Sequence, residues 1–190
     1  MLNYIPIFEL FLLIIMVLIR SAMLRRHGIK VIVFGVTHKT DFLIIPVVLL
    51  FLYAMLSPIF NFPFPNILTA NFWENKILYI CAVVLCSITL IWFAVTLKVF
   101  GKSFRVGIDE NTKNDLITNG TFSISRNPIY LAFITFFTGM FLSYPNIISS
   151  LFLLLIILTI HRQILREEAF LKKQYGDEYE KYCKKVRRYI

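Results

Sequence analysis

Long apolar stretches alternate with shorter polar segments along this chain. An α-helix needs about 20 mostly apolar residues to cross the hydrocarbon core of a bilayer, which is roughly 30 Å thick. The stretches that reach or approach this length are residues 4–19, 42–60, 77–97, 129–144 and 147–160. Only Pro145 and Asn146 separate the last two. The pattern predicts an all-α membrane protein with five transmembrane helices, of which the fourth and fifth form a helical hairpin.

Polar residues dominate the connection between the third and fourth stretches, residues 98–130. Its repeated glycines and asparagines are typical of a loop. A loop of about 30 residues is usually functional or disordered, and the aliphatic residues inside this one favour an ordered loop. A short strand or turn is predicted at residues 116–122. We therefore expect this loop to carry part of a binding site.

The C-terminal segment after residue 160 has a helical pattern of its own. Its apolar residues recur at offsets of four, four, three and four, which is one face of an α-helix. These residues are Leu171, Tyr175, Tyr179, Tyr182 and Val186. Charged residues fill the opposite face, and Gly176 is expected to bend the helix. The pattern predicts a C-terminal amphipathic helix, and one interpretation places it on the membrane surface.

Composition agrees with a membrane protein. Hydrophobic residues make up 58% of the chain and charged residues 16%, whereas soluble domains have about 45–50% and about 25%. These values exclude an ordinary soluble domain. We expect residues 1–190 to form one integral membrane domain, with three helices in residues 1–97 and the binding part in residues 98–190.

The distribution of positive charge predicts the orientation. Of the 20 lysines and arginines, only Lys76 falls on one side of the five-helix arrangement. Cytoplasmic loops hold the excess of basic residues, so we expect the N-terminus outside and the C-terminus in the cytoplasm. The membrane would be the plasma membrane in a bacterium and the endoplasmic reticulum in a eukaryote. Topology and attraction to anionic lipid headgroups account for the net charge of +9, so no nucleic-acid partner is expected.

The chain has three cysteines and three histidines, which are scattered. It contains no CxxC motif and no cluster with metal-ligand spacing. We predict no disulfide framework and no metal site.

The predicted hairpin returns the chain to the membrane face that it left. The residues around Pro128 and the segment from Arg162 to Glu168 should therefore lie close together. The paired acids Glu167 and Glu168 cost solvation energy near a membrane unless a positive group faces them. That group is either Arg162 with Arg166, as ion pairs at the surface, or a cationic ligand.

Two segments carry a resemblance to a known family. "LITNGTFSISRNPIYLA" resembles the loop that opens the cofactor site of isoprenylcysteine carboxyl methyltransferases and related phospholipid methyltransferases. "REEAFLKKQYGDEYEKYCKKVRR" resembles their second motif, and "FRVGIDE" is similar to bacterial members. The resemblance covers residues 98–188, with the two motifs in order and separated by one hairpin.

The resemblance implies that the chain binds S-adenosylmethionine without a Rossmann domain. The residues that it assigns to the cofactor are Asn114, Asp115, Leu116, Ile117, Phe122, Asn127, Pro128, Ile129, Tyr130, Glu167 and Glu168. The residues that we expect to act in catalysis are Arg126, Tyr130, Arg162 and Arg166.

Three positions depart from the family pattern. Asn127 replaces a common histidine, Ala132 replaces a glycine, and Gln163 aligns with the arginine that orients the substrate. Arg162 or Arg166 would then take over that role. The family's acceptors include prenylated cysteine carboxylates and phospholipid amines.

The function expected from the resemblance is methyl transfer to a lipophilic acceptor, most like that of a protein-S-isoprenylcysteine carboxyl O-methyltransferase acting as a monomer. A carboxylate acceptor needs no general base, whereas an amine must lose a proton. One alternative is a phospholipid N-methyltransferase. Others are a sterol-reductase-like membrane enzyme that uses NADPH and a membrane scaffold without catalytic activity.

Overall fold

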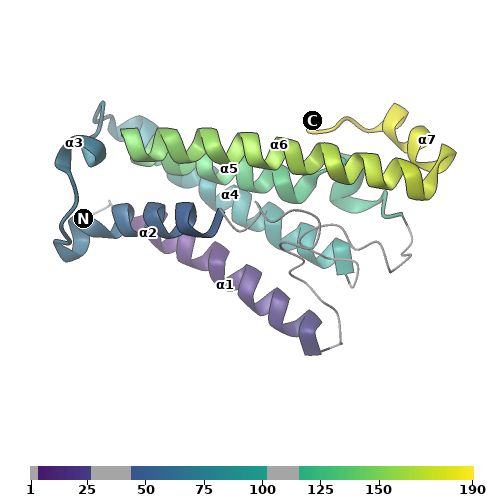
Figure 1. Ribbon diagram of the computed structural model, residues 1–190, viewed down its shortest axis with the longest axis horizontal. Coiled ribbons are helices and arrows are strands. Elements are labelled where there is room, and N and C mark those ends of the chain that lie inside the picture. The colour runs from purple at the N-terminus through teal and green to yellow at the C-terminus, as the bar shows by residue number, and fades with distance from the viewer. Residues whose placement is uncertain (1–3, 27–43, 102–115) are drawn as a thin grey trace.

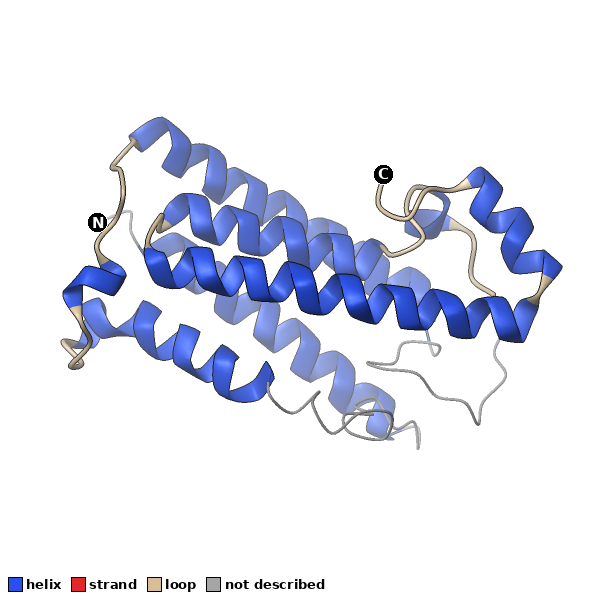
Figure 2. Cartoon of the chain, turned by 45° about the horizontal axis from the view of Figure 1, so that its top comes forward, coloured by secondary structure: helices blue, strands red, loops and turns tan. Residues whose placement is uncertain are grey.

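The computed structural model describes residues 4–26, 44–101 and 116–190. Within them it has seven α-helices, one 3-10 helix and no strand. The elements are α1 (Ile5–Arg26), α2 (Ile44–Phe60), α3 (Asn66–Thr69), α4 (Lys76–Phe100), η4 (Gly120–Ser123), α5 (Pro128–Ser143), α6 (Ile147–Tyr175) and α7 (Asp177–Lys185). Figures 1 and 2 show an elongated bundle in which α5 and α6 run side by side and α7 lies at the far end of α6. The all-α prediction is confirmed for these residues.

Three helices are long and apolar enough to cross a membrane: α1, α4 and α6, with 22, 25 and 29 residues. The shorter helices α2 and α5 have apolar segments at Pro46–Phe60 and Pro128–Ser143. Each predicted apolar stretch therefore forms a helix, while membrane crossing by α2 and α5 stays a prediction. The helix α6 continues past residue 160 to Tyr175, so the fifth apolar stretch and the first part of the C-terminal helical segment form one helix.

Local sequence signals explain several helix ends. The side chains of Asn75 and Asn146 cap α4 and α6 by accepting hydrogen bonds from backbone amides two or three residues ahead, at 2.9–3.1 Å. Pro128 is the first residue of α5, where its fixed φ suits a helix start. Gly176 separates α6 from α7 with a φ of 53°, a left-handed conformation that favours glycine. This is the bend that the sequence predicted.

The core lies between the long helices. The rings of Phe51 on α2 and Phe152 on α6 stack with centroids 3.9 Å apart. The helix α1 packs beside α4, where Ser87 Oγ donates to Glu9 Oε1 at 2.5 Å, and the Glu9 side chain is buried. These contacts join α2 to α6 and α1 to α4, and α4 in turn packs against α5.

The C-terminal amphipathic face is covered by the protein. Tyr179 and Tyr182 on α7 are buried and pack with Leu171 of α6 and with Leu116. This packing leaves the apolar face unavailable to a membrane surface, so the interpretation that α7 lies on the bilayer through that face is wrong. Residues 120–123 form the 3-10 helix η4, which fits the turn predicted there rather than a strand.

Gly139 allows close packing of α5 on α4, and we expect an alanine there to destabilise the protein. A Cβ at this position would overlap Cys86 Sγ and lie 3.2 Å from the Ala82 carbonyl oxygen. Overpacking of this kind costs about 1–3 kcal/mol. The free energy of unfolding of Gly139→Ala should therefore fall by that amount in a denaturant titration in detergent.

A double-mutant cycle checks the cause. Cys86→Ala removes the sulfur atom, so the combination with Gly139→Ala should recover part of the loss. Strict additivity of the two substitutions would show that the Cys86 contact is not responsible.

Candidate active site

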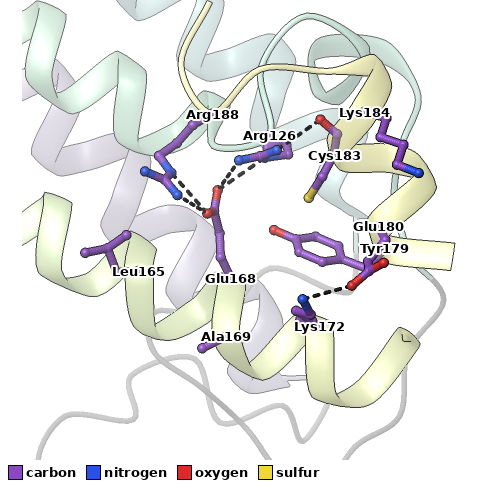
Figure 3. A pocket seen from close by; sticks show the side chains of 10 residues that line it. All are labelled: Arg126, Leu165, Glu168, Ala169, Lys172, Tyr179, Glu180, Cys183, Lys184 and Arg188. Atoms are coloured by element: carbon purple, nitrogen blue, oxygen red, sulfur yellow. Dashed lines mark hydrogen bonds and ion pairs between the residues drawn. The ribbon is translucent and has the colours of Figure 1, made fainter. Parts of the chain in front are cut away.

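Glu168 lies at the centre of a charged cluster where α6 meets the start of α5 and the C-terminal segment (Figure 3). Arg126 donates to its Oε1 from Nε at 3.2 Å and from Nη2 at 3.0 Å. Arg188 donates to its Oε2 from Nε at 3.0 Å and from Nη2 at 2.8 Å. The Glu168 side chain is only 12% exposed. Paired hydrogen bonds between arginine and carboxylate are strong and directional. This cluster therefore fixes the positions of α6, the loop before α5 and the C-terminal segment relative to one another.

The residues after α7 also bind the loop before α5 through their backbone. The Arg126 amide donates to the Arg187 carbonyl at 3.0 Å. The Arg188 carbonyl accepts from Ser125 Oγ and from Asn127 Nδ2, both at 3.2 Å. Asn127 Nδ2 also donates to Glu168 at 3.2 Å. Residues 186–190, called the strap below, therefore lie across the open end of the α5–α6 hairpin. This open end, called the mouth below, is where the start of α5 meets residues 162–168 of α6.

Glu167 belongs to a second polar group that is separate from the first. Tyr130 Oη donates to its Oε1 at 2.5 Å, and Gln163 Nε2 donates to the same oxygen at 2.9 Å. Successive residues on a helix point about 100° apart. Glu167 therefore faces α5 while its neighbour Glu168 faces the strap and α7. Both of these hydrogen bonds fall on Oε1, so Oε2 takes no part in them.

Packing and hydrogen bonds position the loop residues of the first motif. Trp92 Nε1 on α4 donates to the carbonyl of the buried Pro128 at 3.0 Å, which ties the start of α5 to α4. Tyr182 Oη donates to the Phe122 carbonyl at 2.6 Å. Burial raises the pKa of Tyr182 to about 12, so its hydroxyl stays protonated as the donor near neutral pH. The Phe122 ring lies 5.0 Å from that of Phe100 at the end of α4.

The structure brings together some of the residues that the sequence singled out. Asn127 and Tyr130 reach the two glutamates directly, while Ile129 packs against the main core. Leu116 lies with the buried face of α7 and Ile117 follows it, half-buried. The predicted cofactor residues Asn114 and Asp115 lie outside the described residues.

The arginines that form ion pairs with Glu168 differ from those that the sequence suggested. They are Arg126 and Arg188, whereas the expected pairs involved Arg162 and Arg166. Arg162 is exposed on α6 and Arg166 is half-buried. Sequence reasoning missed Arg188. The available signal was its place as the last residue of the second quoted motif.

A model of the phospholipid methyltransferase family matches residues 76–178, more than half of the chain. The chain belongs to the phospholipid methyltransferase family. The match runs from the start of α4 into α7 and contains Tyr130 and both glutamates. The resemblance noted in the sequence is thereby confirmed. Three described helices are also long and apolar enough to cross a membrane, which supports an integral membrane protein.

The chain is also similar in sequence to a fungal methyltransferase. The chain is 35% identical over 89 residues to the protein-S-isoprenylcysteine O-methyltransferase of Schizosaccharomyces pombe (strain 972 / ATCC 24843). The match covers 45% of this chain and 38% of that protein, so the chain aligns with well under half of the relative's length. No solved structure matches this member of the phospholipid methyltransferase family.

Proposed function

We propose that this protein transfers the methyl group of S-adenosylmethionine to a lipophilic acceptor at the membrane. The observation that carries the proposal is the carboxyl group of Glu167, held by Tyr130 and Gln163 at the mouth of the α5–α6 hairpin. A carboxylate in this setting is unusual unless it serves a ligand, because intramembrane and interfacial acids are costly.

The donor set fits the cofactor. S-adenosylmethionine carries an electrophilic methyl group on a sulfonium and has an ammonium and ribose hydroxyls. Both described hydrogen bonds of Glu167 use Oε1, so Oε2 is available to accept from an ammonium or a hydroxyl. Asn127 uses Nδ2 for Glu168 and for the strap, which leaves its side-chain oxygen as an acceptor. Phe122 would supply an apolar surface.

The chain's own task is then to position the reactants and exclude water. Holding two reactants in productive geometry can contribute roughly 7–11 kcal/mol to the lowering of a barrier. Tyr130 and Gln163 fix the carboxyl group of Glu167, and Pro128 fixes the direction in which α5 leaves the loop. The strap keeps the loop against α6, which limits the access of water to this mouth.

A carboxylate acceptor of the isoprenylcysteine type agrees best with these residues. It reacts as an anion and needs no proton acceptor, whereas an amine must first lose a proton. The similarity to the fission yeast protein supports the same choice. Gln163 stands where the family carries its substrate-orienting arginine, so this proposal gives that role to Arg162 or Arg166. An amine acceptor, as in phospholipid N-methylation, is the second candidate because of the family model that matches.

The basic residues support an orientation with the N-terminus outside and this mouth in the cytoplasm. The cofactor would then enter from the cytoplasm and the lipophilic acceptor from the bilayer.

Two measurements test the proposed function. Titration calorimetry should show that the purified protein binds S-adenosylhomocysteine and does not bind NADPH. Transfer of a tritiated methyl group to membrane extract should then yield a labelled lipophilic product. Mass spectrometry would identify that product as an ester or an amine. Binding of NADPH alone would favour the reductase alternative, and binding of neither ligand would favour a scaffold.

A further inference from the structure

A cleft of about 500 Å³ opens between α6 and α7, and Glu168 but not Glu167 is among the residues that line it. Four basic and two acidic side chains line it, which leaves the lining with a net charge of +2. The basic residues are Arg126, Lys172, Lys184 and Arg188. The proposed methyl transfer does not use this cleft.

The charges of the cleft are only partly neutralised. Glu168 takes two hydrogen bonds from Arg126 and two from Arg188, so two guanidinium groups share one carboxylate. Arg188 donates to Glu168 from Nε and Nη2, and its side chain is 36% exposed. Lys172 forms an exposed ion pair with Glu180 at 2.8 Å. Such surface pairs are weak, so an incoming anion can compete for the lysine.

A buried hydroxyl group points into the same cleft. Tyr179 lines it from α7, and its ring points toward Glu168 (Figure 3). The side chain is only 3% exposed, and its hydroxyl has no oxygen or nitrogen partner within the described residues; the thiol of Cys183, a weak hydrogen-bonding group, lies beside it. Buried hydroxyl groups nearly always have a partner. An acceptor oxygen on a ligand would supply it.

The apolar wall of the cleft continues along α6 as an exposed row of leucines. Leu165 and Ala169 line the cleft. Beyond the exposed Arg162, the same helical face continues with Leu158, Leu155 and Leu151, which recur at helical spacing and are 44–54% exposed. Because α6 is one of the candidate membrane spans, this row leads from the bilayer interior to the cleft.

The geometry points to a binding site for an anionic phospholipid, with the phosphate in the α6–α7 cleft and an acyl chain along the leucine face of α6. Lys172, Lys184 and Arg188 would neutralise the phosphate, and Tyr179 would donate to one of its oxygens. The net positive charge of the residues that line the cleft favours an anionic headgroup over a zwitterionic one. The leucine row favours a lipid over a free phosphate ion. The site goes beyond the proposed methyl transfer and does not depend on it.

Calorimetry on the full chain in a zwitterionic detergent tests the site with soluble short-chain lipids. We expect dioctanoyl phosphatidylglycerol to bind, and dioctanoyl phosphatidylcholine, glycerol 3-phosphate and inorganic phosphate to bind at least tenfold more weakly. Equal binding of phosphatidylcholine would overturn the role of the positive charge. Equal binding of glycerol 3-phosphate or inorganic phosphate would overturn the assignment to a lipid.

Matched variants locate the site. The double variant Lys172→Gln with Lys184→Gln removes two exposed charges from the cleft and should weaken phosphatidylglycerol binding by about 30-fold, since each basic residue contributes about 1 kcal/mol near anionic lipid. The control Lys173→Gln with Lys185→Gln removes the same charge from the same two helices outside the cleft and should change affinity less than threefold. Similar losses in both variants would mean that binding reflects net charge alone.

Tyr179→Phe tests the buried hydroxyl. It should lower phosphatidylglycerol affinity by about tenfold or more, since a hydrogen bond to a charged group contributes about 1.5–3 kcal/mol. The thermal unfolding midpoint without lipid should change little, because the Cys183 thiol is a weak partner and no oxygen or nitrogen of the described residues accepts from that hydroxyl. Unchanged affinity would remove Tyr179 from the site.

Discussion

Glu167→Gln is expected to abolish most of the affinity for S-adenosylmethionine while leaving the protein folded. The substitution keeps the size of the side chain and removes the negative charge that would face the cofactor's ammonium. Hydrogen bonds to charged groups contribute about 1.5–3 kcal/mol each, so the dissociation constant should rise roughly 10- to 150-fold. Titration calorimetry with S-adenosylhomocysteine measures this directly.

Two further variants serve as comparisons for Glu167→Gln. Glu178→Gln makes the same chemical change at an exposed position on α7 and should bind normally. Tyr130→Phe removes one of the two donors that hold Glu167 Oε1 and should cause a smaller loss. If Glu167→Gln binds as tightly as Glu178→Gln, the cofactor is held elsewhere and this site assignment is wrong.

Glu168→Ala is expected to destabilise the fold by about 3 kcal/mol. Removing one partner of a largely buried ion pair is strongly destabilising because the remaining charge stays buried without compensation. Here the change leaves both Arg126 and Arg188 without their shared carboxylate, and Asn127 loses an acceptor. Denaturant unfolding in detergent should show the loss, and the C-terminal strap should become more sensitive to proteolysis.

The exposed pair between Lys172 and Glu180 provides the control for that experiment. Its side chains are 66% and 50% exposed, and exposed pairs contribute between 0 and about 1 kcal/mol. Glu180→Ala should therefore cost less than about 1 kcal/mol. Equal losses in the two variants would show that the cluster around Glu168 does not hold the strap in place.

The two adjacent glutamates show where sequence reasoning stopped. The second motif marked both as site residues, and the apolar stretches placed them near the start of α5. The sequence did not reveal that Glu167 meets Tyr130 while Glu168 meets Arg126 and Arg188. Their side chains point in different directions around α6, so the role of each depends on which element packs against its own side.

Features that depend on neighbouring residues could be predicted from sequence. The lengths of the apolar stretches predicted the helices. Asparagine caps, Pro128 and Gly176 explain where helices begin or end, because capping and backbone preference act within one turn. The two family motifs pointed to the isoprenylcysteine and phospholipid methyltransferases, and the family match confirms this resemblance.

Features that depend on distant residues required the tertiary structure. Arg188 lies 20 residues from Glu168 and Ser125 lies 63 residues from Arg188, yet these contacts form the strap. The apolar face of α7 could equally have faced a membrane, and only its packing with Leu116 and Leu171 decides that it faces the protein. Periodicity along a chain tells which face of a helix is apolar. The partner that covers the face is set by the packing of the whole bundle.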